Sequence, residues 1–117
     1  MPDIVHLQSL FDSSGDNTAQ AAKTSAGTLH YMHIVNSNTA QAFLQLFDVA
    51  AADVTVGTTT PKLTFLVPAG DGVNSGGFTE LIDGGITFGT AITYACTTAP
   101  TTNGNPTTGL TVNLLYR

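Results

Sequence analysis

Apolar runs of about five to nine residues recur along the whole chain, and clusters of Gly, Asn, Asp and Pro separate them. A helical period of 3.6 residues never persists for a dozen residues, whereas alternation with a period of two occurs within several of the runs. Short strands at this spacing are typical of antiparallel sandwiches and barrels. The sequence therefore predicts an all-β fold, an antiparallel two-sheet sandwich of about eight strands with a jelly-roll-like arrangement.

The expected strands follow from the runs and their punctuation by turn residues. They cover residues 4–11, 25–36, 42–49, 62–67, 77–82, 86–88, 90–98 and 110–116. The cluster 36–39 is a strong turn signal, which predicts that 25–36 and 42–49 form an antiparallel pair. Residues 50–53 are expected to wind into a brief helical turn, and 12–17 to form an Asx-rich turn.

Alternation also predicts which side chains face the core. In the last strand one face carries Leu110, Val112, Leu114 and Tyr116, and the other carries Thr111, Asn113, Leu115 and Arg117. The strand before it has Ile92, Tyr94 and Cys96 on one face. Cys96 is therefore expected to be a small core hydrophobe.

The segment 42–49 is apolar on both faces. Phe43, Phe47 and Val49 share one face, while Leu44 and Leu46 share the other. An antiparallel sheet normally leaves one face to water. Either a loop of the same chain or another subunit must cover the second face. For the second alternative the interface candidates are Phe43, Phe47 and Val49, with Ile4 and Leu7 of the N-terminal segment.

Charge is scarce, at 9% of the residues against about 25% in an average soluble domain. The exterior must consist largely of Thr, Ser, Asn, Gln, Gly and Ala, which desolvates easily and suits contact with other proteins. The net charge is −5, and Lys23, Lys62 and Arg117 are far apart. Nucleic-acid binding needs clustered Lys and Arg, so no nucleic-acid partner is expected.

The length of 117 residues fits one domain with a real core. Residues 23–117 are expected to form the sandwich. Residues 1–22 are expected to form an N-terminal strand and turn-rich arm, either part of the same domain or a docking arm. No apolar stretch approaches a membrane span and no secretion signal is recognisable, so synthesis in the cytoplasm and no membrane partner are expected.

Candidate chemistry is sparse. His30 and His33 stand three apart on an expected strand, which places them on opposite faces, and His6 adds no ligand pattern. The cluster 12–17 lacks the alternating acids of a Ca²⁺ loop, and Glu80 and Asp83 do not suggest a glycosidase pair. No nucleophile motif or phosphate loop is present. We therefore expect no catalytic, cofactor or metal site and no enzymatic activity.

Several segments resemble small β-rich virion proteins of tailed bacteriophages. They are the run 31–48, the segment 58–63, the pair 84–88 and 91–96, and the C-terminal residues 112–117. The resemblance spans about residues 25–117. Among such proteins the chain looks most like a jelly-roll capsid decoration, or cement, protein.

The resemblance implies a homotrimer on the outer surface of the virion shell. It would bind the major capsid protein, bridge neighbouring capsomers and resist the pressure of the packaged DNA. A tail, fibre or baseplate accessory protein is the first alternative. A soluble carbohydrate-binding module is an alternative of another class, and it requires Tyr31, Tyr94 or Tyr116 to be exposed.

Overall fold

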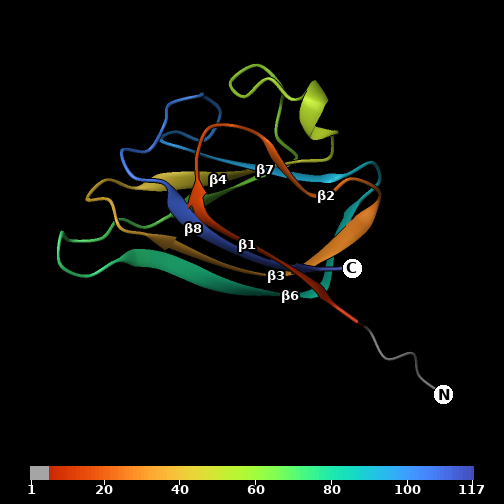
Figure 1. Cartoon of the computed structure of the whole chain (residues 1–117), viewed down its shortest axis with the longest axis horizontal. Helices are drawn as coiled ribbons and strands as arrows, with labels where there is room; N and C mark the ends of the chain where they lie inside the picture. The colour runs from red at the N-terminus through yellow and green to blue at the C-terminus, as the bar shows by residue number, and fades with distance from the viewer. Residues whose placement is uncertain (1–5) are drawn as a thin grey trace.

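Two four-stranded antiparallel sheets pack face to face in the computed structural model, which describes residues 6–117 (Figure 1). Sheet A has the order β1-β8-β3-β6 and sheet B the order β2-β7-β4-β5. The strands of sheet A are β1 (Gln8–Gly15), β8 (Leu110–Tyr116), β3 (Gly27–Asn36) and β6 (Gly76–Phe88). Those of sheet B are β2 (Gln20–Lys23), β7 (Ile92–Thr97), β4 (Ala42–Phe47) and β5 (Leu63–Val67).

The eight strands pair as they would in one long β-hairpin that is then rolled up. Strand β1 pairs with β8, β2 with β7, β3 with β6 and β4 with β5, all antiparallel. Folding such a hairpin over itself distributes the four pairs between two sheets, which is the topology of an eight-stranded jelly roll. The predicted fold class is confirmed. The expected helical turn is also present, as the 3-10 helix η1 (Ala51–Asp53). No helix of the described residues is long and apolar enough to cross a membrane.

The core lies between the sheets and follows the predicted alternation. In β8 every second residue is buried, from Leu110 to Tyr116, and the residues between them are half-buried. Strands β3, β4 and β7 contribute Ile34, Leu44 and Ile92 to the same cluster. Cys96 belongs to this cluster and has no exposed surface, as predicted.

The predicted pairing of residues 25–36 with 42–49 is wrong. Strand β3 pairs with β6 and β8 in sheet A, whereas β4 pairs with β5 and β7 in sheet B. The connection is an arch between sheets, which buried Asn36 fixes. Its Oδ1 accepts hydrogen bonds from Asn38 N and Nδ2, and its Nδ2 donates to Ala40 O. The turn residues reverse the chain here, but packing of the core places the next strand in sheet B and not beside β3 in sheet A.

Two further boundaries differ from the prediction. Residues 77–82 and 86–88 belong to one strand, β6, because Gly84 and Gly85 adopt φ of 78° and 81° and form a bulge inside the strand. Strand β2 was not predicted, since its four residues show no clear alternation.

Strand β1 extends through part of the expected turn, as far as Gly15. The chain then crosses to sheet B, where Cys96 N donates to Asp16 O. The described residues of the segment 1–22 are therefore paired into the same two sheets, through β1 and β2. Residues 1–5, including Ile4, lie outside the described part of the chain.

The outer face of sheet B is covered by the chain itself over β4 and β7, while Thr64 and Leu66 of β5 stay exposed. Two loops, 48–62 and 98–109, lie over it (Figure 1). Beneath them Gln45 and Thr97 have no exposed surface, and Gln45 Nε2 donates to Thr97 Oγ1 (2.7 Å) and to Thr102 O (2.9 Å). Thr93 Oγ1 donates to Val49 O in the other loop (2.6 Å). Strand β7 is consequently buried along its whole length on both faces.

The crossing at Gly15 has no room for a side chain. A Cβ at this position would lie 2.9 Å from both Cys96 Sγ and Val112 Cγ2. We expect Gly15→Ala to lower the free energy of unfolding by about 1–3 kcal/mol, the usual cost of overpacking a core. Gly89→Ala is the matched control, because its Cβ would meet only Asp48 Oδ2 at 3.6 Å. Urea unfolding of both variants measures this, and equal stabilities would contradict the packing described.

Candidate interaction surface

The predicted interface residues do not gather in one place. Phe43 and Val49 are half-buried on the sheet B side, while Leu7, which is exposed, immediately precedes β1 of sheet A. Phe43 pairs with Leu66 of β5, which is 48% exposed, so a small apolar spot remains at this end of sheet B.

Phe47 was among the predicted interface residues, but the structure buries it. It lies on the predicted face of β4, opposite Thr93, but it has no exposed surface. The loops that cover sheet B bury it within its own chain. The double-sided apolarity of β4 is therefore explained by loop cover, and Phe47 is not available to a second subunit in this fold.

The outer face of sheet A is the larger open surface. Because Met32, Ile34, Val112 and Leu114 point into the core, the residues between them point outward. The strand register aligns the outward residues in three rows across the sheet. They are Ser9, Leu115, Tyr31 and Leu81; Phe11, Asn113, His33 and Thr79; and Thr111, Val35 and Gly77. We call these residues the uncharged face.

Two large side chains of the uncharged face project into solvent. Phe11 on β1 is 70% exposed and Leu81 on β6 is 76% exposed. They stand at opposite edges of the sheet, with half-buried Tyr31 and Leu115 between them. Sequence reasoning missed this surface. The available signal was an apolar residue at a position expected to be wet, such as Leu115 in the last strand.

None of the eight acids and three bases of the chain stands in these rows, but alternation places exposed Asp83 of β6 and exposed Arg117 after β8 on the same side of the sheet, at its end near Leu81 and Leu115. The polar side chains at the centre already have partners in the protein. His33 Nδ1 lies 2.6 Å from Thr79 Oγ1, and Asn113 Nδ2 donates to His33 O at 3.2 Å. Covering the three rows would therefore leave few polar groups without hydrogen-bond partners. The centres of protein interfaces are likewise depleted of charged residues.

The edges of the sheets are poor sites for association. Strand β2 has four residues, and β5 has five between Pro61 and Pro68. The edge strands of sheet A carry acids at core-facing positions, since Glu80 stands opposite Met32 and Asp12 opposite Val112. Short edges, flanking prolines and inward charges all oppose strand addition. A partner is better accommodated on a face than on an edge.

The histidines do not build a metal site. The register of β3 shifts between Leu29 and Tyr31, so the strand gains an extra residue at His30. The simple alternation that placed His30 and His33 on opposite faces therefore does not hold. Among residues 6–117, no group of three or more His, Cys, Asp or Glu side chains could hold a metal ion.

The remaining candidate groups are occupied in holding the fold. Asp12 Oδ1 accepts from Ser14 N, and its Oδ2 accepts from Tyr94 OH at 2.7 Å across the sandwich. Burial, together with this hydrogen bond, raises the pKa of Tyr94. Burial also raises the pKa of Cys96 to about 12, so its thiol is neutral and shielded from reagents. These residues serve the structure.

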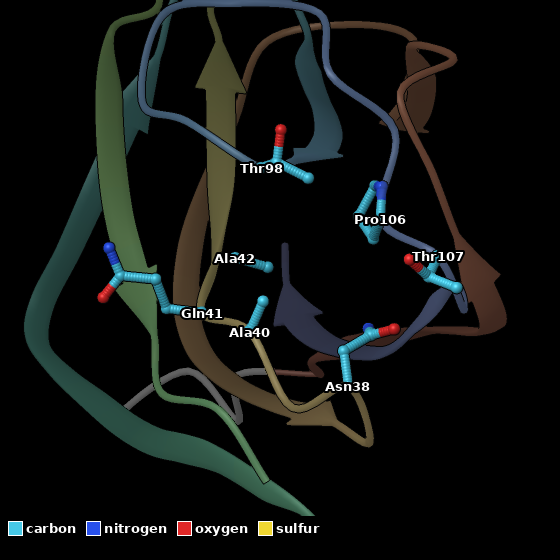
Figure 2. A pocket seen from close by; sticks show the side chains of 7 residues that line it. All are labelled: Asn38, Ala40, Gln41, Ala42, Thr98, Pro106 and Thr107. Atoms are coloured by element: carbon cyan, nitrogen blue, oxygen red, sulfur yellow. The ribbon is translucent and has the colours of Figure 1, made fainter.

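A small cavity lies at the end of the sandwich where the β3–β4 arch meets the loop before β8 (Figure 2). Its volume is about 40 Å³, and it is lined by Asn38, Ala40, Gln41, Ala42, Thr98, Pro106 and Thr107. Asn38 Oδ1 accepts from Thr108 N and its Nδ2 donates to Thr108 O, which closes one side. The space suits one or two water molecules and is too small for an organic ligand.

No protein-family model, no curated protein and no solved structure matches this chain. The exposed surface of the protein is therefore the main guide to its function.

The loop cover of sheet B depends on Gln45. Replacing it with Leu leaves buried Thr97 Oγ1 without its donor, and an unpaired buried polar group costs about 1–3 kcal/mol. We expect Gln45→Leu to lower the free energy of unfolding by this amount and to speed amide hydrogen exchange in residues 98–105. Gln41→Leu is the exposed control. Unchanged exchange in that loop would contradict the proposed role of Gln45.

Asp48 gives the fold a dependence on pH. Its carboxylate accepts hydrogen bonds from the backbone N–H groups of Gly89, Thr90 and Ala91. The Gly89 bond is the largest cause of a pKa of Asp48 below 3.8. The Thr90 and Ala91 bonds and the charge of Lys62 lower this pKa further, against partial desolvation, which raises it. The pKa of Asp48 is lower in the folded protein than in the unfolded chain. The hydrogen bonds to its carboxylate therefore stabilise the fold above the pKa of the unfolded state, and this stabilisation is lost as the pH falls through the pKa of the folded state.

We expect Asp48→Asn to cost about 1 kcal/mol at pH 7, after discounting for partial exposure. The difference from wild type should be constant above about pH 5 and should shrink below pH 3.8. Urea unfolding of both proteins across this range measures it. A difference that persists at the lowest pH would count against the account.

Proposed function

We propose that this protein is a non-enzymatic structural protein of a tailed-phage virion. In this proposal it decorates the outer surface of the assembled capsid as a homotrimer, binds the major capsid protein and stabilises the shell by bridging capsomers. The observation that carries the proposal is the uncharged face of sheet A, on which Phe11 and Leu81 are exposed without a partner among the described residues.

The fold supports the proposal by analogy. Eight-stranded jelly rolls are used by viral capsid proteins, and also by lectins and cupins. Because one fold serves many functions, the surface has to carry the argument. A scarcity of charge, edges that oppose strand addition and an apolar sheet face suit a protein whose task is to stay attached to other proteins.

The mechanism is stabilisation by mass action. A ligand that binds only the assembled shell lowers the free energy of that state by its own binding free energy. At a free concentration one hundred times the Kd, this amounts to about 2.7 kcal/mol for each site. A shell offers many equivalent sites, so modest contacts add up to a large resistance to disassembly.

Two alternatives make different predictions. A tail, fibre or baseplate protein would use the same surface at another place in the particle. A carbohydrate-binding module needs exposed aromatic platforms, but Tyr94 and Tyr116 are only 2% and 8% exposed. Only Tyr31, which is half-buried, remains for that alternative.

Co-sedimentation with purified phage shells that lack the protein tests the proposal. We expect the wild-type protein to pellet with expanded shells in saturable amounts and to raise the temperature at which the shells break open. Unexpanded shells and isolated tails are the controls. Protein that stays in the supernatant with shells would contradict the capsid assignment, and pelleting with tails alone would support the first alternative.

A further inference from the structure

We propose that Asn103 is a site of spontaneous covalent modification, at which water slowly converts the side-chain amide to a carboxylic acid and reroutes the main chain. The attacking group is the backbone nitrogen of Gly104. This chemistry is independent of the proposed function. Its consequence falls on loop 98–109, which covers sheet B and is held there by Gln45.

Asn103 differs from the other asparagines of the chain in having a free side-chain amide. Six of the seven asparagines use their side chains in hydrogen bonds of the fold; they are Asn17, Asn36, Asn38, Asn74, Asn105 and Asn113. Asn103 is exposed, and its side-chain amide has no hydrogen-bond partner among residues 6–117. The fold therefore leaves this one amide open to attack.

The residue that follows Asn103 is able to attack it. Gly104 has no side chain to shield its backbone nitrogen, and its N–H donates to no acceptor in the described part of the chain. The fold requires glycine here, because a Cβ would collide with Thr98 Oγ1. Asn105, by contrast, precedes Pro106, whose nitrogen carries no hydrogen to lose. The reactive pair is therefore Asn103 with Gly104.

The reaction is a hydrolysis by way of a cyclic imide. Hydroxide removes the proton from Gly104 N, this nitrogen bonds to Asn103 Cγ, and the bond from Cγ to Nδ2 breaks. Nδ2 takes a proton from water and leaves as ammonia. The attack is intramolecular, because both groups belong to adjacent residues.

A second water molecule then opens the imide. Breaking the bond from the nitrogen to Cγ gives aspartate. Breaking the bond from the nitrogen to the main-chain carbon gives isoaspartate, in which the main chain runs through Cβ and Cγ. In sum one amide and one water give one carboxylic acid and one ammonia, so no oxidant or reductant is needed.

Isoaspartate disturbs the attachment of the loop. Three successive carbonyl oxygens tie this segment to other parts of the fold. They are Thr102 O, which accepts from Gln45 Nε2 (2.9 Å), Asn103 O, which accepts from Asn17 Nδ2 (2.7 Å), and Gly104 O, which accepts from Thr98 N (3.0 Å). Isoaspartate adds one backbone atom between the first and the last of them and turns the middle one into a carboxylate. The three anchors then lose their present spacing, and the loop loosens.

The modified residue also lies where the two loops that cover sheet B meet. A Cβ at Gly57 of loop 48–62 would lie 3.2 Å from Asn103 Cβ, so the Asn103 side chain passes close to that loop. Either product adds one negative charge to the net charge of −5 at this contact. Modification at Asn103 therefore acts on both halves of the cover.

Peptide mapping by mass spectrometry tests the site. Folded protein is kept in neutral and in mildly alkaline buffer, and electron-transfer fragmentation separates aspartate from isoaspartate. We expect Asn103 to react before the other six asparagines, faster in the alkaline buffer, with isoaspartate as the larger product. An Asn103 that keeps its amide while another asparagine reacts, or a chain in which no asparagine reacts, would overturn the inference.

Two variants separate the new charge from the rerouted main chain. Asn103→Gln keeps an amide but forms the larger imide ring far more slowly, and fresh Asn103→Asp carries the charge without the extra backbone atom. Both should fold, because Asn103 is exposed. Amide hydrogen exchange in residues 98–105 should speed up as wild type ages, and should stay slow in aged Asn103→Gln and in fresh Asn103→Asp. Equal exchange in fresh and converted wild type would contradict the loosening of the cover.

Discussion

Strands β4 and β7 are almost entirely buried on both of their faces, so sheet B depends on a cover over the outer side of these two strands. The chain meets this need by itself. The loops 48–62 and 98–109 close over the sheet, held by the buried amide of Gln45 and by the bond from Thr93 to Val49. The sandwich therefore has one closed side and one open side, and sheet A forms the open one. A sandwich of this kind can stay folded alone and still offer a flat surface to partners.

Local alternation accounts for most of the fold that could be predicted. The two faces of β8, the core position of Cys96 and the apolarity of β4 on both sides all follow from a period of two. The predictions of strand pairing and strand boundaries fail where contacts between distant parts of the chain override the local sequence pattern. Asn36 and its neighbours form a turn in the sequence, but only core packing decides that the turn joins two sheets. Gly84 and Gly85 resemble a loop, yet their positive φ allows a bulge within β6.

The candidate surface was harder to predict than the strands. Phe47 looked like an interface residue because the sequence does not show which loop folds over which sheet. Phe11 and Leu81 were not singled out, because their exposure depends on the partners that β1 and β6 find in sheet A. A strand's outer face can be named from its sequence. Whether that face is covered depends on contacts far away in the chain.

Hydroxyl-radical footprinting with mass spectrometry tests the central claim most directly, since it reports the exposure of each side chain in solution. The account predicts that oxidation of Phe11 and Leu81 falls as the protein is concentrated from dilute monomer, while that of Val73 stays constant. Phe47 should remain protected at every concentration. If Phe11 and Leu81 stay as reactive as Val73 throughout, they contradict the proposal that the outer face of sheet A is a contact surface.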